Sequence, residues 1–163
     1  MQIRPAVDDD LPQILVIHNH AIRESTAIWT DTLATLSERR RWLDQHRTAG
    51  QLAIVATDGD EVLGYATYGP WRAKEGYRFT VENSVYVRDD RTGQGLGQAL
   101  MLALISAARD AGFHVMIAAI EAGNLGSIRL HERLGFVDAG TVRGVGYKFD
   151  RWLDLTHMRL ELE

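Results

Sequence analysis

The chain has 163 residues, of which 45% are hydrophobic and 25% charged, so it is long enough for one domain with its own core and too short for two ordinary ones. It contains no cysteine, which excludes disulfide frameworks, thiolate metal sites and cysteine nucleophiles. A formal net charge of -4 argues against a general nucleic-acid binder, which would present a basic surface.

No apolar run approaches the roughly 18 to 20 residues that a membrane span needs. The N-terminal stretch MQIRPAVDDD lacks a basic segment followed by an apolar one, as a secretion signal would have. We therefore expect a cytoplasmic protein without a membrane partner. The absence of cysteine fits that reducing compartment.

The N-terminal third is expected to form a strand and two helices. Residues 1–6 are expected to be extended. A helix is predicted after Asp8 to Asp10, because apolar residues follow at helical spacing at Leu11, Ile14, Ile17 and Ala21. A second helix is predicted from Thr35, where TLSE matches a capping box, to about Gly50.

The remaining chain is expected to alternate strands and helices. The segments 51–57 and 61–69 flank the sequence DGD, which predicts an antiparallel hairpin. Further elements are expected in this order: a strand at 79–87, a helix at 95–111, a buried strand at 114–121, a short helix within 124–136 that is closed by Gly135, and a late strand at 147–162. The pattern predicts a single domain over residues 1–163, with a mixed α/β sheet.

Three glycines at alternate positions, Gly93, Gly95 and Gly97, stand between a strand and a helix. Glycines let a ligand approach the backbone, and a helix start offers unpaired N–H groups to an anion, so a phosphate or diphosphate is the expected guest. The alternative is an ordinary tight turn. Neither the spacing G-x-G-x-x-G nor a P-loop occurs, which argues against those two nucleotide-binding motifs.

Several motifs together resemble a known family. The order strand, G-x-G loop, amphipathic helix, buried strand and GNLGSIRLHERLGF is similar to the GNAT superfamily of acetyl-CoA-dependent N-acetyltransferases, over essentially the whole chain. More narrowly, TAIW, YGPWR, TVENSVYV, GQGLG and YKFDRWLDL resemble the phosphinothricin and methionine sulfoximine acetyltransferases. The resemblance implies the GNAT fold, a twisted mixed sheet of about seven strands with about four helices, and no metal.

The resemblance also implies a cofactor site for acetyl-CoA. Main-chain N–H groups of the loop are expected to hold the diphosphate: Gly93, Gln94, Gly95, Leu96, Gly97 and Gln98. The main chain of Val85, Tyr86 and Val87 is expected to pair with the pantetheine arm like an added strand. Where the family usually has Arg or Gln in the loop this chain has Thr92, so a phosphate contact is expected from Arg91 or Arg88 instead.

Glu82 is the candidate general base. An amine must be neutral to attack, and a lysine-like amine with a pKa of about 10.4 is neutral only about once in 10³ at pH 7. Strand alternation places Glu82 on one face with Thr80, Ser84 and Tyr86. From the residues alone it could equally face solvent or pair with Arg72 or Arg78; in the resembling enzymes the Glu of TVE is the proposed base.

His131 stands where many family members have a tyrosine acid, and it can exchange a proton near neutrality, although a structural role is the alternative. A thiol with a pKa of about 8.5 can leave as thiolate, so such an acid helps without being essential. Asn124 resembles the family residue that contacts pantetheine, and its alternative role is to cap the last helix. With no cysteine and no activated serine, direct attack by the amine is the simpler mechanism.

The resemblance implies an acceptor pocket for a small amino-acid analogue, whose carboxylate needs a cation such as Arg72 or Arg78. Trp29, Lys148 and Trp152 match subgroup positions and are expected to wall this pocket or to form a dimer contact, with ordinary packing as the alternative. The remaining expected acceptor contacts are Ala73, Lys74, Asn83 and Ser84. Ala73, Lys74 and Asn83 depart from the usual subgroup residues, so side-chain selectivity is open.

Two further features carry no functional prediction. His18 and His20 in HNH point to different sides of a helix and cannot chelate one metal together. Residues 39–41 are three arginines, which we expect to be a solvated helix face.

Three functions follow as hypotheses: acetylation of the α-amine of a small amino-acid analogue, acetylation of protein N-termini or lysines, and coenzyme A sensing without catalysis. A homodimer is expected from the family only.

Overall fold

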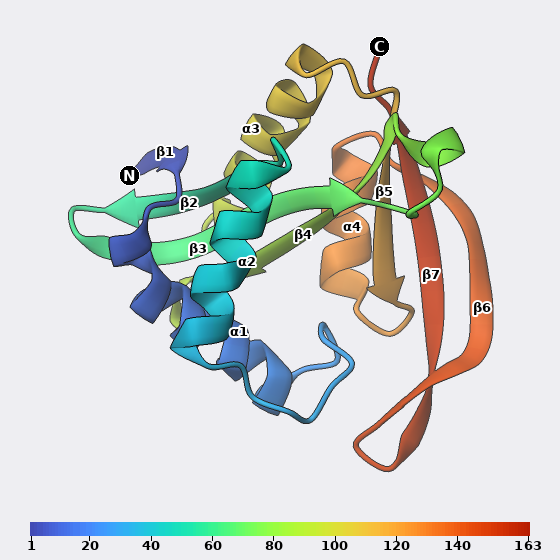
Figure 1. Ribbon diagram of the computed structural model, residues 1–163. Coiled ribbons are helices and arrows are strands. Elements are labelled where there is room, and N and C mark those ends of the chain that lie inside the picture. The colour runs from blue at the N-terminus through green and yellow to red at the C-terminus, as the bar shows by residue number, and fades with distance from the viewer.

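A seven-stranded sheet in the order β1-β2-β3-β4-β5-β7-β6 runs through the computed structural model, which describes residues 1–163 (Figure 1). Its strands are β1 Gln2–Pro5, β2 Ala53–Asp58, β3 Glu61–Pro70, β4 Thr80–Val87, β5 Val115–Glu121, β6 Val137–Lys148 and β7 Arg151–Glu161. All neighbours are antiparallel except β4 and β5, which are parallel. The predicted mixed α/β sheet is confirmed.

Four helices cover the sheet: α1 Leu11–Glu24, α2 Leu36–Thr48, α3 Leu96–Asp110 and α4 Leu125–Arg133. Helices α1 and α2 lie on one face, and α3 and α4 lie on the other (Figure 1). The predicted start of α2 is confirmed, because the side chain of Thr35 accepts a hydrogen bond from Glu38 N at 3.2 Å and Glu38 Oε2 accepts one from Thr35 N at 2.7 Å.

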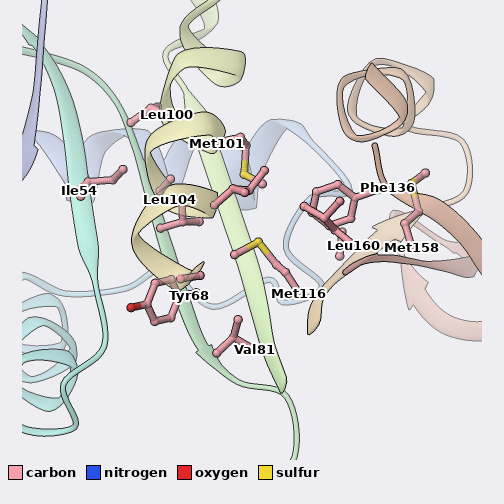
Figure 2. Packing of buried hydrophobic residues seen from close by; sticks show 14 of the residues in the cluster. Ile54, Tyr68, Val81, Leu100, Met101, Leu104, Met116, Phe136, Met158 and Leu160 are labelled. Carbon is pink, nitrogen blue, oxygen red and sulfur yellow. The ribbon is translucent and has the colours of Figure 1, made fainter. Parts of the chain in front are cut away.

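The larger core lies between the sheet and α3. Leu100, Met101 and Leu104 of α3 are fully buried, and Met116 of β5 and Met158 of β7 pack in the same cluster (Figure 2). A smaller cluster lies under α1 and α2. Because strand residues alternate between the two faces, the two clusters identify which side of β4 each side chain faces.

The hairpin predicted at DGD is confirmed. Asp58 pairs with Glu61, so Gly59 and Asp60 form a two-residue loop, and Gly59 has a φ of 56°.

The expectation of one late strand over residues 147–162 is wrong. Residues 147 and 148 end β6, and β7 begins at Arg151 after a two-residue turn, Phe149 and Asp150, with φ values of 51° and 55°. Two positive φ values in a row make the tight turn that suits a right-twisted hairpin. The sequence did not predict strand β6, because its sequence VDAGTVRGVGYK contains three glycines and its pairing with β7 is interrupted twice.

No helix combines the length and apolar character needed to cross a membrane.

Candidate active site

Strands β4 and β5 separate in the middle of the sheet. They pair only from Thr80↔Val115 to Glu82↔Ile117, whereas β4 stays paired with β3 as far as Val87. Beyond Glu82, the edge of β4 that faces β5 therefore has no strand partner. Such a free edge can hydrogen-bond an extended ligand as if it were an added strand.

A cleft of about 670 Å³ opens at this separation. Ser84, Tyr86 and Ala119 reach it from one face of the sheet, and Asn83 and Leu130 reach it from the other. The cleft thus passes through the sheet. Nine of the ten residues predicted to bind the cofactor line it, namely Val85, Tyr86, Val87, Gly93, Gly95, Leu96, Gly97, Gln98 and Asn124; Gln94 is exposed outside it.

The glycine turn forms one end of the cleft, and glycine is needed at its positions for two different structural reasons. Gly93 and Gly95 have φ values of 75° and 79°, in the left-handed region, and Gly95 is the N-cap of α3. A Cβ on Gly97 would lie 3.2 Å from Leu130 Cδ2, so this glycine allows close packing against α4. The first N–H groups of α3 have no partner within the helix and lie beside the cleft, which suits a diphosphate.

Arg88 and Arg91, the two arginines near this turn, differ in how closely acidic side chains hold them. Arg88 is held by Asp90 and Glu61, with Nη2 lying 2.9 Å from Asp90 Oδ2. Arg91 lines the cleft, and its acidic contacts are longer: Nη2 lies 3.4 Å from Glu61 Oε2 and Nε lies 3.9 Å from Asp90 Oδ2. Of the two cations predicted to replace the usual loop residue, Arg91 lines the cleft and Arg88 does not, and the phosphate contact itself stays a prediction.

Asn124 caps α4, since its Oδ1 accepts a hydrogen bond from Ser127 N at 3.2 Å. It also lines the cleft, so the structural and the ligand-contact interpretations are compatible.

Glu82 lies at the last β4–β5 pair, half-buried, on the face opposite the large core. Burial raises its pKa above the ordinary value, and the charges of His157 and Arg72 act in the opposite direction. Arg72 is therefore close enough to influence Glu82. Arg78 is turned elsewhere, because its guanidinium lies 4.6 Å from the ring of Phe79.

His157 of β7 is a neighbour of Glu82 that sequence reasoning missed. Ile117 is the β5 partner of Glu82, Ala119 lies two residues further on the same face, and His157 pairs with Ala119. Only the strand register brings this histidine to the site, so no local sequence signal could have found it.

The whole segment that carries Arg72, Ala73, Lys74 and Arg78 is exposed between β3 and β4. Arg72 lies 5.0 Å from the ring of Trp71. Within this segment, Arg72 acts on Glu82 electrostatically, and the predicted acceptor contacts of the segment stay predictions.

His131 and Asn83 meet on the other side of β4. His131 Nε2 lies 3.1 Å from Asn83 Oδ1, its Nδ1 lies 2.8 Å from the carbonyl oxygen of Ser127, and Asn83 Nδ2 donates to the carbonyl of Ile117 at 3.1 Å. Both ring nitrogens face acceptors, so an imidazolium satisfies both and a neutral ring only one. Burial nevertheless lowers the pKa of His131, with the Ser127 bond acting in the opposite direction. Asn83 contacts His131 and also lines the cleft, and its predicted contact with the acceptor stays a prediction.

The prediction that Lys148 contacts the substrate is wrong. The residue is 2% exposed, and its ammonium donates three hydrogen bonds, to the carbonyl oxygens of Ile22 at 2.6 Å, Ser25 at 2.7 Å and Ile28 at 2.7 Å. An ammonium has three donors, so none remains for a ligand.

The structure also places Trp29 and Trp152, which were predicted to wall the acceptor pocket together with Lys148, in two different environments. The ring of Trp29 packs on β6 so closely that a Cβ on Gly146 would lie 2.2 Å from it. Trp152 is 71% exposed and contacts Tyr147 edge to face, with ring centroids 5.0 Å apart. Its expected part in a dimer contact stays a prediction.

Arg39 departs from the expected solvated face of α2, whereas Arg40 and Arg41 are exposed as predicted. Its guanidinium lies 4.7 Å from the ring of Trp42 and is half-buried, because this side of α2 packs against the sheet. His18 Nδ1 lies 2.9 Å from the hydroxyl of Tyr65, and burial, assisted by Arg39, lowers the pKa of His18 to about 4.

Comparison with known proteins gives consistent matches. Residues 14–136 match the model of the Acetyltransferase (GNAT) family. The chain is 55% identical to an L-methionine sulfoximine/L-methionine sulfone acetyltransferase of Pseudomonas aeruginosa, covering 99% of this chain and 94% of the relative. It is 40% identical to a phosphinothricin N-acetyltransferase of Streptomyces coelicolor, covering 95% and 92%.

Two solved structures have nearly the same fold. An acetyltransferase of Salmonella typhimurium in complex with acetyl-CoA has a TM-score of 0.98 and 44% identity, covering 100% of this chain and 94% of that one. A ribosomal-protein-alanine N-acetyltransferase of Brucella melitensis has a TM-score of 0.97 and 45% identity, covering 99% of both chains.

Proposed function

Because the chain belongs to the GNAT acetyltransferase family, we propose that this acetyl-CoA-dependent enzyme acetylates the α-amine of small amino-acid analogues of the methionine sulfoximine, methionine sulfone and phosphinothricin type. The single observation that carries the proposal is the opening between β4 and β5, which joins the glycine turn on one side to the face of Glu82 on the other.

The residues present fit acetyl-CoA. The turn at Gly93 and Gly95 offers main-chain N–H groups to the diphosphate, Arg91 offers a cation, and the free edge of β4 offers hydrogen bonds to the amides of pantetheine. When bound, acetyl-CoA supplies an activated thioester carbonyl. The protein's task is to orient that carbonyl and to manage the protons.

Glu82 takes the proton of the attacking amine. An α-ammonium group has a pKa of about 8 in a peptide, so at neutral pH a base is needed to obtain the nucleophilic form. A carboxylate whose pKa is raised by burial is a stronger base than an exposed one. Arg72 binds the substrate carboxylate, and this keeps the amine on the same side of the sheet as Glu82.

His131 gives a proton to the departing thiolate. Its ring is fixed between Asn83 and Ser127 at the wall of the cleft, with both nitrogens facing acceptors. Burial lowers the pKa of His131, so its imidazolium gives up a proton more readily than an exposed one. The amine attacks directly, because no side chain of the site is an activated nucleophile.

Acetyl transfer should be measured with methionine sulfoximine, methionine sulfone, phosphinothricin, ordinary amino acids and a peptide with an N-terminal alanine. We expect the highest kcat/KM on the three analogues. Turnover of the peptide alone would overturn the proposal in favour of protein acetylation, the activity named for the Brucella melitensis neighbour. Binding of acetyl-CoA without any turnover would favour the sensor hypothesis.

A further inference from the structure

Lys148 sits in an unusual environment for a lysine. Its ammonium is surrounded by three carbonyl oxygens, those of Ile22, Ser25 and Ile28. Ile22 lies in the last turn of α1 and Ser25 is its C-cap, so this cation satisfies carbonyls that the helix leaves unpaired. The remaining carbonyl belongs to the segment that follows α1.

The segment 25–29 reaches the cleft. Ala27 is one of the residues that line it. Thr26 Oγ1 donates to Glu121 Oε2 at 3.0 Å, and Glu121 lines the cleft at the end of β5. Trp29 Nε1 donates to the carbonyl of Thr26 at 2.8 Å, so the segment is also closed on itself.

Lys148 joins this segment to β6, which comes more than 100 residues later in the chain. The ring of Phe149 lies 4.7 Å from the ammonium. Burial lowers the pKa of Lys148, and Asp31 acts in the opposite direction. Burying an ammonium costs free energy, whereas an apolar side chain of the same length would pack in the same space without that cost. The contacts that justify the charge are the three carbonyls of the cleft-side segment.

We propose that Lys148 is a positioning residue for the acceptor amine, whose ammonium holds residues 25–29 in place as the cleft wall beside Glu121. This inference rests on the proposed function, because Glu121 lies on the face of the sheet that carries Glu82, where the proposal places the acceptor. Lys148 itself does not touch the substrate.

The test is Lys148→Met, which keeps the unbranched side chain except for its terminal ammonium and removes its donors, with Arg151→Met as the matched control. Arg151 is an exposed cation opposite Lys148 in the same hairpin. We expect Lys148→Met to raise the KM for the acceptor about 10- to 100-fold, the scale on which misplacement affects a site, with little change in the Kd of acetyl-CoA. Arg151→Met should leave both constants unchanged.

Chemical rescue separates positioning from simple packing. Lys148→Ala lacks the atoms of n-propylammonium, so this cation should restore a low acceptor KM, whereas 1-propanol should not. The wild-type enzyme should not respond to either. An acceptor KM that is unchanged in Lys148→Met, or a rescue by 1-propanol as effective as that by the cation, would overturn the inference.

A second variant covers the case in which Lys148→Met does not fold. Thr26→Val removes the hydrogen bond to Glu121 at the same segment, and we expect it to raise the acceptor KM in the same direction. An unchanged KM would contradict the assigned wall. Proteolytic cleavage of residues 25–34 should also be faster in the Lys148 variants, a readout that needs no turnover. Absence of wild-type turnover on the amino-acid panel would instead refute the proposed function.

Discussion

Replacing Glu82 with Gln removes the proposed base while keeping nearly the same shape. General-base catalysis contributes about 10²- to 10⁴-fold, which at 1.36 kcal/mol per tenfold corresponds to about 2.7 to 5.4 kcal/mol of the barrier. The other carboxylate at the cleft is that of Glu121, whose two oxygens accept hydrogen bonds from Thr26 Oγ1 at 3.0 Å and from Gly123 N at 2.9 Å. We therefore expect Glu82→Gln to lower kcat/KM for methionine sulfone by about 10²- to 10⁴-fold.

The pH dependence of kcat/KM tests the role of Glu82 as a base. A base must be deprotonated, so wild-type kcat/KM should fall as the pH decreases through the pKa of Glu82, which burial raises above the ordinary value. In Glu82→Gln this acidic limb should disappear, and the remaining rate should follow the fraction of neutral amine.

The assay is release of coenzyme A from pH 5 to 9, with calorimetry of acetyl-CoA binding as the control for an intact cofactor site. A variant that keeps the acidic limb, or retains activity close to that of the wild type, would refute the assignment of Glu82 as the base.

Three further outcomes are expected. Because the pKa of Glu82 is raised in the folded state, its ionised form is disfavoured there. Glu82→Gln should therefore melt at a higher temperature than the wild type at pH 7 and at the same temperature below pH 4. Scanning calorimetry at the two pH values tests this. Gly95→Ala should lower the free energy of unfolding by about 1 to 2 kcal/mol, since φ is 79° at this position and a Cβ would meet no other atom, so that the cost comes from the backbone conformation alone. The same variant should bind acetyl-CoA more weakly. A free energy of unfolding equal to that of the wild type would contradict the assigned left-handed conformation. Arg72→Gln should move the acidic limb of kcat/KM to higher pH, because Arg72 lowers the pKa of the base, whereas Arg78→Gln should leave the limb in place.

Local chemistry made part of the fold predictable. The capping box at Thr35, the two-residue loop at Gly59 and the glycine turn before α3 each depend on residues within a few positions of one another. The cap at Asn124 is also local. The residues that determine these features therefore all lie within a short stretch of sequence, where they can be recognised without the structure.

Long-range contacts made the rest unpredictable. Lys148 finds its three carbonyls in a segment more than 100 residues earlier, and His157 reaches the face of Glu82 only through two strand registers. The strand β6 was hidden because Gly140 and Gly144 have positive φ values and interrupt the alternation that marks a strand. The expectations of a homodimer and of a cytoplasmic location stay predictions.

A crystal structure with coenzyme A and methionine sulfone tests most directly whether the opening between β4 and β5 joins the two substrates. We expect the diphosphate on the N–H groups at the start of α3, the thiol inside the opening, and the amine of methionine sulfone within hydrogen-bond reach of Glu82. A pantetheine arm that runs outside the opening, or an amine bound on the far side of the sheet from Glu82, would contradict the account.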